Sequence, residues 1–183
     1  PLLAPTLHKL RSAGKRLFLL TNSRWPFTEA MMTYLLGGAM PEYPSFRHFF
    51  DAIVVAANKP SFFQEGRPLM IREGQETRPA SFPLERGAVH EGGNLHDLER
   101  ALGTTGDRIL YVGDHIFGDM LRSRRESAWR TAMIVQELET EVAAHETCRE
   151  MHRKAAELEA KREDLEDQLR FWQSRFKEIA RRL

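Results

Sequence analysis

The heptapeptide RILYVGD, residues 108–114, is a short apolar run that ends in a glycine and an aspartate. A continuous apolar run of this length, closed by small or polar residues, is typical of a strand that is buried on both faces of a parallel sheet. The same pattern occurs in three other stretches, namely residues 16–22 (RLFLLTN), 52–57 (AIVVAA) and 131–135 (TAMIV). The sequence therefore predicts four buried strands.

Helical patterns lie between several of these strands. They cover residues 7–13, 28–36, 94–102 and 119–128. In the second of them, the spacing of Met31, Met32 and Leu35 predicts that these side chains face the core. Strands that alternate with helices predict an α/β fold with right-handed crossovers and a mostly parallel sheet. Residues 61–87 interrupt the alternation with Pro, Gly, Arg and Glu, which predicts a loop with at most a small hairpin.

The composition excludes several classes of protein. The 27 Lys and Arg residues nearly balance the 26 Asp and Glu residues, so a net charge of +1 gives no global reason to expect nucleic acid or an anionic membrane as partner. The single cysteine, Cys148, excludes an intramolecular disulfide and a zinc site built on paired cysteines. No apolar run approaches the ~18–20 residues needed to span a bilayer. We therefore expect a soluble, intracellular protein.

The last part of the chain has a different character. Residues 137–183 contain neither glycine nor proline, and apolar or small residues recur there at alternating steps of four and three, interrupted once at Arg162. These residues are Ala144, Cys148, Met151, Ala155, Leu158, Leu165, Leu169, Trp172, Phe176, Ile179 and Leu183. The pattern predicts a heptad seam on a long helix or a helical hairpin. We expect a core over residues 1–140 and a helical tail over 141–183 that packs on this core. A homo-oligomer formed through the tail is the alternative, although two of its aromatic residues are bulky for a two-stranded seam.

Polar side chains follow three of the four predicted strands. The first strand ends in Thr21-Asn22-Ser23, the second leads to Asn58-Lys59, and the third ends in Asp114, with Asp119 five residues further on. Taken alone, each of these groups is typical of a turn, a helix cap or a solvated charge. In parallel sheets, ligands bind beyond the carboxyl ends of the strands. The occurrence of polar residues after three strands of the same sheet therefore favours a shared binding site. Hydroxyls, a lysine and two carboxylates suit a phosphate together with a divalent cation.

These residues also resemble a known family. Residues 19–23 (LLTNS), 59–63 (KPSFF) and 111–119 (YVGDHIFGD) closely resemble motifs II, III and IV of the haloacid dehalogenase superfamily. Within it, the chain is most similar to the cytosolic purine 5′-nucleotidases that prefer IMP and GMP, and to their nucleotidase-domain-containing relatives. Residues 92–95 (GGNL), residues 129–131 (WRT) and the Glu-rich tail match the same group. The resemblance covers nearly the whole chain.

The resemblance implies a phosphate-binding role for four residues. Thr21 and Asn22 would bind the transferring phosphoryl group, and Ser23 would lie close to the substrate phosphate. Lys59 would neutralise charge on the phosphate and on the attacking carboxylate. Phosphoryl transfer spreads negative charge over the equatorial oxygens, so a cation and oriented donors are expected to supply most of the stabilisation.

The resemblance also implies a metal site and an effector site. Asp114 would ligate Mg²⁺, and Asp119 would ligate it through water or orient the lysine. Phe117 and Arg124 fall where the family's purine-nucleotide effector site has an aromatic platform and a basic residue. We expect His115 to pack or to cap the loop after Asp114, and not to act as an acid or base.

One part of the family's machinery has no counterpart in the sequence. The family's reaction begins with an aspartate nucleophile in an Asp-x-Asp motif, on a strand that lies between the strands of motifs II and IV and precedes a large cap. No Asp-x-Asp occurs in these residues. We therefore expect the core to lack its first strand and its cap, and the chain to be the C-terminal part of a longer enzyme. The gap could close by direct pairing of the two strands, or another chain could supply the missing one.

The sequence thus leads to three functional hypotheses. The first is a cytoplasmic, Mg²⁺-dependent 5′-nucleotidase that hydrolyses purine nucleoside monophosphates through an aspartyl-phosphate, with the isolated chain inactive. The second is a non-catalytic relative that binds or regulates, and the third is an interaction module built on the helical tail. An upstream Asp-x-Asp would separate the first from the second.

Overall fold

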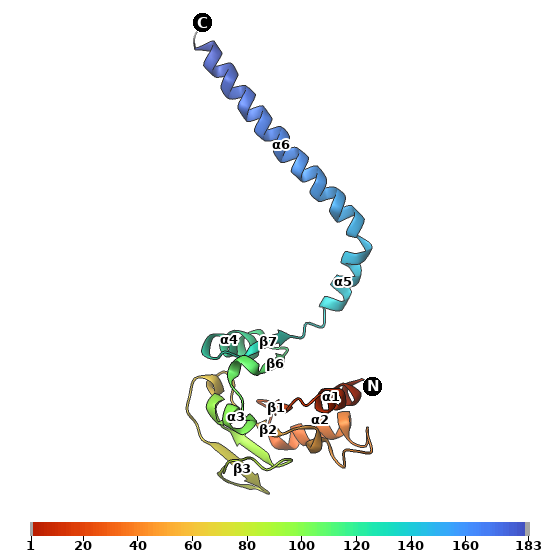
Figure 1. Ribbon diagram of the computed structural model, residues 1–183, viewed down its shortest axis with the longest axis vertical. Helices are drawn as coiled ribbons and strands as arrows, with labels where there is room; N and C mark the ends of the chain where they lie inside the picture. The colour runs from red at the N-terminus through yellow and green to blue at the C-terminus, as the bar shows by residue number, and fades with distance from the viewer. Residues whose placement is uncertain (1, 182–183) are drawn as a thin grey trace. The chain divides into compact units, whose positions relative to one another are not determined.

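The structure is a computed structural model that describes residues 2–181. The chain forms two compact units, Pro1–Ile134 and Val135–Leu183. The first unit contains all the strands that the structure describes, and the second consists of helices α5 and α6 (Figure 1).

The first unit is built on a mixed sheet of five strands. Its spatial order is β1-β2-β5-β3-β4. The strands are β1 (Phe18–Leu20), β2 (Ala52–Val55), β3 (Leu69–Glu73), β4 (Glu76–Pro79) and β5 (Val89–Gly92). β1, β2 and β5 run parallel, whereas β3 is antiparallel to both β5 and β4. The α/β class is therefore confirmed. Residues 61–87, predicted to be a loop with at most a small hairpin, contain β3 and β4, which extend the sheet.

The two remaining predicted strands form a separate sheet. β6 (Leu110–Gly113) pairs in parallel with β7 (Arg130–Met133). Among the residues that the structure describes, β1 pairs only with β2 and β6 only with β7, so direct pairing of β1 with β6 is wrong for this chain. The two strands meet through side chains instead, because the ring of Phe18 stacks on that of Tyr111, with centroids 6.3 Å apart. Within the described residues, β1 and β6 therefore each keep one backbone edge without a strand partner.

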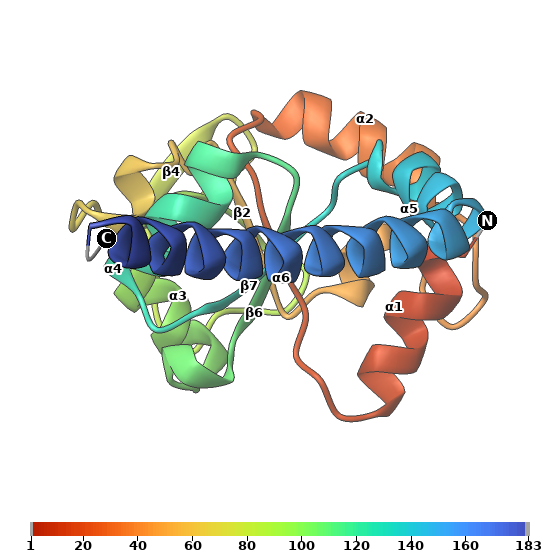
Figure 2. The same ribbon diagram turned by 90° about the horizontal axis from the view of Figure 1, so that it is seen from above.

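Helices cover both faces of the main sheet (Figures 1 and 2). α1 (Leu3–Ser12), α2 (Trp25–Leu36) and the 3-10 turn η1 (Phe46–Phe49) pack on one face, and α3 (Leu95–Leu102) packs on the other. β2 contributes to both cores, because Ile53 and Val55 face the first group of helices while Ala52 and Val54 face the second. This double burial explains why β2 appears in the sequence as a continuous apolar run.

The buried face of α2 differs from the prediction. Met31 and Leu35 are 42% and 47% exposed, and only Met32 is partly buried. The helix begins at Trp25, three residues earlier than predicted. The indole of Trp25 packs against Phe46, with ring centroids 6.1 Å apart, and this large buried ring sets the rotation of the helix.

The predicted helix over residues 119–128 is divided in two. The π-helical turn η4 (Ile116–Leu121) comes first, followed by the short helix α4 (Arg122–Glu126). Two further 3-10 turns, η2 (Ser61–Phe63) and η3 (Gly106–Arg108), precede β3 and β6. α3 matches its prediction, since Asn94 caps it by accepting a hydrogen bond from the backbone N–H of Asp97 at 3.0 Å.

The second unit confirms the predicted long helix. α5 (Leu138–Thr147) is followed by α6 (Arg149–Ala180), and neither helix contains a buried residue. Cys148, at the junction of the two helices, is half-buried. Among residues 2–181, no helix combines the length and the hydropathy that crossing a membrane requires.

Candidate functional site

Lys59 stands at the centre of a cluster formed by the ends of β1, β2 and β6. Its Nζ lies 2.7 Å from Oδ1 of Asp119, 2.6 Å from the hydroxyl of Tyr111 and 3.4 Å from the carbonyl oxygen of Leu20. The side chains of Lys59 and Asp119 are 10% and 8% exposed. The structure thus brings together residues that are 60 positions apart in the chain.

The backbone of Lys59 is held by Asn22. Oδ1 of Asn22 accepts from the Lys59 N–H at 2.6 Å, and its Nδ2 donates to the Lys59 carbonyl at 2.9 Å. The turn before Lys59 is tight, with left-handed φ angles of 46° at Ala56 and 56° at Asn58. Both ends of the Asn22 amide are therefore used to position the lysine.

The hydroxyl groups of Thr21 and Ser23, at the end of β1, are able to donate hydrogen bonds to a ligand. Oγ1 of Thr21 accepts from the backbone N–H of Ser23 at 3.1 Å, which leaves its own proton free. Within residues 2–181, the hydroxyl of Ser23 makes no hydrogen bond. Two short hydroxyl side chains thus lie at the end of the same strand whose last carbonyl, that of Leu20, contacts Lys59.

Asp119 is the buried counter-ion of the cluster. Besides Lys59, its Oδ1 accepts from the Tyr111 hydroxyl at 2.8 Å, and its Oδ2 accepts from the backbone N–H of His115 at 3.3 Å. Burial alone raises the pKa of a carboxyl group, but the hydrogen bonds from Lys59 and Tyr111 outweigh it and hold the pKa of Asp119 below its ordinary value. Asp119 is therefore ionised at neutral pH.

Gly113 makes room for this carboxylate. A Cβ at position 113 would lie 2.6 Å from Oδ2 and 2.8 Å from Cβ of Asp119, closer than non-bonded atoms approach. The requirement is steric, since the backbone at Gly113 is not in the left-handed region. Any other residue at the end of β6 would push Asp119 away from Lys59.

Tyr111 links the ion pair to a wall of aromatic rings. Its ring lies 5.7 Å from that of Trp129 and 6.1 Å from that of Phe63. The indole N–H of Trp129 donates to Oε1 of Glu99 at 2.9 Å, which ties this wall to α3. Burial and the hydrogen bond to Asp119 both raise the pKa of Tyr111, so the phenol stays neutral.

Two carboxylates, those of Asp114 and Asp119, could hold a metal ion, and their surroundings differ. Asp114 is exposed and has no hydrogen bond or ion pair within the described residues, whereas both oxygens of Asp119 are engaged. Among residues 2–181, no three side chains of the His, Cys, Asp or Glu type are grouped to hold a metal. Mg²⁺ binds through one or two carboxylates together with waters and substrate oxygens. Asp114 and Asp119 fit the protein side of such a site in part.

The residues of the expected effector site are both on the surface. Phe117 is 68% exposed in η4, and Arg124 is exposed in α4. Neither makes a hydrogen bond, ion pair or ring contact with another described residue. His115 behaves as expected of a cap, because its Nδ1 accepts from the backbone N–H of Gly118 at 2.8 Å.

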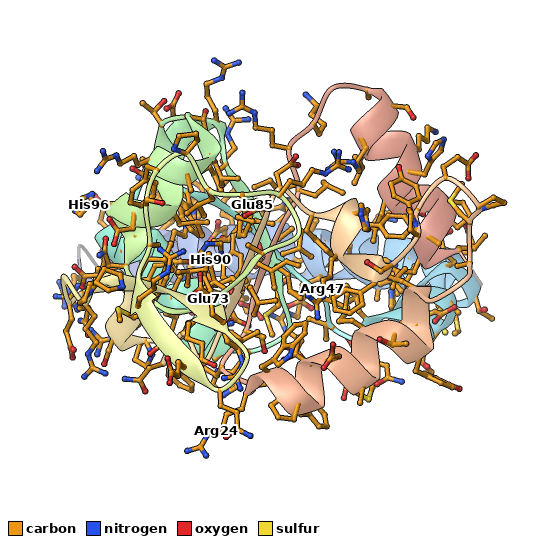
Figure 3. All side chains as sticks on the ribbon, turned by 90° about the horizontal axis from the view of Figure 1, so that it is seen from below. Arg24, Arg47, Glu73, Glu85, His90 and His96 are labelled. Carbon is orange, nitrogen blue, oxygen red and sulfur yellow. The ribbon has the colours of Figure 1, made fainter. Side chains whose placement is uncertain are left out.

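The other histidines of the first unit lie elsewhere. His90 is buried in β5, where Nδ1 lies 3.3 Å from the Ile53 carbonyl, and His96 is exposed on α3 (Figure 3). Burial lowers the pKa of His90 in spite of this backbone contact, so the imidazole is neutral. Neither histidine contacts the Lys59 cluster.

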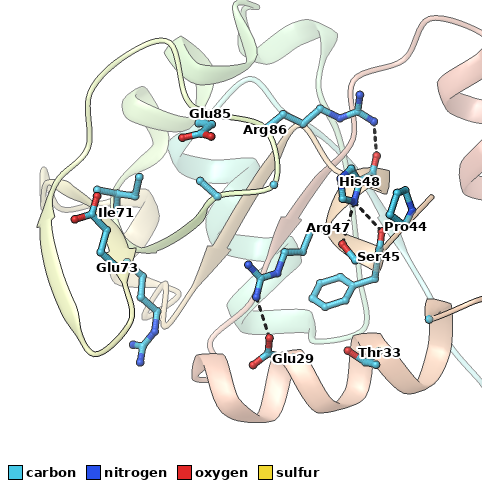
Figure 4. Close-up of a pocket in the computed structure, with 15 residues that line it drawn as sticks. Glu29, Thr33, Pro44, Ser45, Arg47, His48, Ile71, Glu73, Glu85 and Arg86 are labelled. Carbon is cyan, nitrogen blue, oxygen red and sulfur yellow. Dashed lines mark hydrogen bonds and ion pairs between the residues drawn. The ribbon is translucent and has the colours of Figure 1, made fainter. Parts of the chain in front are cut away.

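A cavity of about 700 Å³ lies on another part of the first unit, lined by α2, η1, β3 and the loop before β5 (Figure 4). Its charged groups are largely paired already, since Arg47 contacts Glu29 at 2.9 Å and Arg86 donates to the His48 carbonyl. No residue of the Lys59 cluster lines it. The ion pair of Lys59 with Asp119 is more deeply buried than the pair of Arg47 with Glu29 in this cavity.

Sequence reasoning gave no role to Tyr111, Gly113 or the Leu20 carbonyl. Tyrosine was the one polar-tipped side chain in an apolar strand, and a buried hydroxyl needs a hydrogen-bond partner. That signal could have pointed to Tyr111. The backbone contact of Leu20 and the steric need at Gly113 have no such signature in a single sequence.

The chain is similar to proteins of a known family. The family model described as "5′ nucleotidase family" matches residues 1–182. The chain is 36% identical over 149 residues to 5′-nucleotidase domain-containing protein 2 of Homo sapiens, covering 80% of this chain and 28% of that protein. The rat protein of the same name is 35% identical over 149 residues (80% and 26%), and a 5′-nucleotidase domain-containing protein of Dictyostelium discoideum is 35% identical over 146 residues (78% and 25%). The chain thus spans about a quarter of the length of these relatives. From its strand-end cluster to its tail, the chain belongs to the 5′-nucleotidase family.

Proposed function

We propose that this chain is the phosphate-binding part of a Mg²⁺-dependent 5′-nucleotidase that hydrolyses purine nucleoside monophosphates of the IMP and GMP type. The observation that carries the proposal is the buried lysine cluster, in which Lys59 is held by Asp119 and Tyr111 beside two free hydroxyls at the end of β1. A fixed cation next to oriented hydroxyl donors is what stabilises a transferring phosphoryl group.

The cluster also suggests how Lys59 meets a substrate. An ammonium group has three N–H donors, and three acceptors already lie within 3.4 Å of Nζ. The contact with the Leu20 carbonyl is the longest, so a phosphoryl oxygen can take its place while Asp119 and Tyr111 keep the side chain in position. Lys59 would then supply charge without moving.

The remaining residues would complete the phosphate site. The hydroxyls of Thr21 and Ser23 would donate to phosphoryl oxygens, and Asn22 would act indirectly by holding the Lys59 backbone. Bound at Asp114 near Asp119, Mg²⁺ would neutralise negative charge on the phosphoryl group. Phe117 and Arg124 would bind a purine-nucleotide effector, since an aromatic face and a guanidinium suit a base and a phosphate.

The nucleophile of this proposal comes from outside these residues. The sequence contains no Asp-x-Asp, and β1 and β6 each keep an edge without a strand partner in the described part of the chain. Both strands end at the cluster, through the Leu20 carbonyl and through Gly113. A strand that paired with these edges would carry its last residues to Lys59 and complete a haloacid dehalogenase-like sheet. The first aspartate of the motif would attack phosphorus, and the bond from phosphorus to the 5′-oxygen would break while the second aspartate protonates that oxygen. The second aspartate would then take a proton from a water that hydrolyses the aspartyl-phosphate.

The test uses the longest reading frame that contains this chain. If this frame encodes an Asp-x-Asp, we expect a cytoplasmic protein that, once purified, releases phosphate from IMP only in the presence of Mg²⁺. The changes Lys59→Met and Asp114→Asn should each abolish turnover. Lys15→Met is the matched control, because Lys15 is exposed and lies outside the cluster. The 183-residue chain alone should release no phosphate. Full activity of the Lys59→Met enzyme would overturn the proposal.

A non-catalytic binding protein is the second candidate. It is favoured by the same observation, because the donors of the phosphate site are intact in a chain without a nucleophile motif. If the reading frame has no Asp-x-Asp, titration of the chain with inorganic phosphate should show heat that Lys59→Met removes and Lys15→Met retains. Absence of this heat would exclude the second candidate.

A further inference from the structure

α6 has a narrow apolar seam that no described residue of its own unit covers. Its d positions are Met151, Leu158, Leu165, Trp172 and Ile179, and its a positions are Ala155, Arg162, Leu169 and Phe176. In the described unit, Leu158 is 57% exposed, Leu165 63% and Phe176 73%. A helix of 32 residues carries more than four heptads, which is long enough for a stable coiled coil.

The side chains that flank the seam have opposite charges on its two sides. The g positions are basic or neutral, with Lys154, Lys161, Gln168 and Arg175. The e positions carry His152, Glu159, Glu166 and Gln173. Polar residues at both flanks limit the apolar strip to two positions per heptad, which is the width of a two-stranded seam and not of a larger bundle. The two bulky seam residues, Trp172 and Phe176, lie near the C-terminal end of α6, so the layers from Met151 to Leu169 contain no aromatic ring.

We propose that α6 pairs with α6 of a second copy of this chain, in parallel and in register. In a parallel pair, each g residue faces the e residue five positions further along the other helix. Lys154 then faces Glu159 of the second copy, and Lys161 faces Glu166 of the second copy. By two-fold symmetry this gives four attractive pairs. The neutral pair of Gln168 with Gln173 follows in the next heptad.

The same charges disfavour the antiparallel arrangement. There, g residues face g residues and e residues face e residues, so lysines would meet lysines and glutamates would meet glutamates. Within residues 2–181, neither Lys154 nor Lys161 makes a hydrogen bond or an ion pair, so both ammonium groups are available. The charge pattern therefore matches that of a second copy of α6 and favours the parallel direction.

Arg162 sets the register. It is the one charged residue at an a position, and on its own helix it contacts Glu159 at 2.6 Å and Glu166 at 3.4 Å. In register, the two arginines share one layer, each neutralised by its own glutamates. A slip of one heptad would place each arginine against Ala155 or Leu169 of the other helix and bury two separate charges. A polar a position costs stability but fixes alignment in this way.

The first test is charge reversal in the full chain, followed by sedimentation velocity over a wide range of concentration. We expect the unmodified chain to sediment at twice its 21.2 kDa. The pair Lys154→Glu with Lys161→Glu, and separately the pair Glu159→Lys with Glu166→Lys, should each weaken self-association by roughly a hundredfold, because four attractive contacts become repulsive. An equimolar mixture of the two variants should restore a dimer, now made of one chain of each kind.

The matched control reverses the same number of charges outside the seam. Glu163→Lys with Asp167→Lys changes the b and f positions, and should leave the dimer intact. A monomeric unmodified chain would overturn the proposal, as would a trimer or tetramer. A dimer that resists both reversals would overturn it too, because it would be held by a surface of the first unit.

A second test reports direction and register. In a Cys148→Ser background, the d-position change Leu158→Cys should form an interchain disulfide under mild oxidation, because a parallel, in-register pair places the two side chains opposite each other. Leu158 lies away from the midpoint of α6, so an antiparallel pair would hold the two cysteines several turns apart. The outer-face change Asp164→Cys should not cross-link. Equal cross-linking of both variants, or of neither, would contradict the parallel register.

Discussion

Replacing Asp119 by asparagine tests whether the Lys59 cluster is held by a buried ion pair. The change keeps the shape of the side chain but removes its charge. Whichever way the new amide turns, its NH₂ meets a donor, since Lys59 and Tyr111 donate on one side and the His115 backbone N–H donates on the other. Asp119→Asn therefore leaves the Lys59 ammonium unpaired and one pair of donors facing each other.

The expected loss of stability follows from the burial of the pair. Lys59 and Asp119 are about nine-tenths buried, at 10% and 8% exposure, and the atoms are 2.7 Å apart. Removing one partner of such a pair costs about 3–5 kcal/mol, because the other charge stays out of water without compensation. We expect a value near the lower end, about 3 kcal/mol, since Lys59 can still reach the Leu20 carbonyl.

The measurement is urea unfolding followed by tryptophan fluorescence, in a Trp172→Phe background so that the signal comes from the first unit. The matched control is Glu73→Gln, which breaks the exposed pair with Arg78 and should not shift the midpoint measurably. A loss for Asp119→Asn no larger than that of Glu73→Gln would refute the reasoning, because the cluster would then be solvated and not buried.

The pH dependence of the same variant has a definite sign. The pKa of Asp119 is lower in the folded chain than its ordinary value of about 3.9, so its contribution is complete above that value and is lost as the pH falls through the lowered pKa. The difference in unfolding free energy between the unmodified chain and Asp119→Asn should be constant near neutral pH and shrink below about pH 4. A difference that grew on acidification would contradict the direction of the shift.

Three further changes test the surroundings of this pair. Gly113→Ala should cost about 1–3 kcal/mol in urea unfolding, because the new methyl group overlaps Asp119; an unchanged midpoint would show that the carboxylate can move aside at no cost. Tyr111→Phe should cost about 1.5–3 kcal/mol, since it removes a hydroxyl bonded to both Lys59 and Asp119, whereas a loss under about 0.5 kcal/mol would mean that water replaces it. Asn94→Ala should cost about 1–2 kcal/mol, because it removes both the cap of α3 and the hydrogen bond to the Arg67 carbonyl; Asn94→Ser should restore the cap alone, and an unchanged midpoint of Asn94→Ala would contradict the prediction.

Much of the first unit could be predicted because its local patterns are strong. The apolar runs of β1, β2, β6 and β7 predicted strands, and the polar residues after β1, β2 and β6 predicted a candidate site. Both patterns can be recognised because each is contained in a few neighbouring residues. β5 was missed for the opposite reason. Its sequence is Val-His-Glu-Gly, which lacks a continuous apolar run. The two polar residues find their hydrogen-bond partners on other strands, His90 at the Ile53 carbonyl and Glu91 at Arg72, 2.5 Å away.

By itself, the sequence determined the α/β class, the positions of four strands, the heptad tail and the types of residue at the candidate site. Only the tertiary structure decided which face of α2 is buried, that β1 and β6 lie in separate sheets, and that Lys59 binds Asp119 and Tyr111. The physical reason is the range of the interactions. Strand and helix patterns arise from burial that recurs along one segment, whereas the rotation of a helix, the pairing of strands and a buried ion pair depend on residues that are distant in the chain and meet only when it folds.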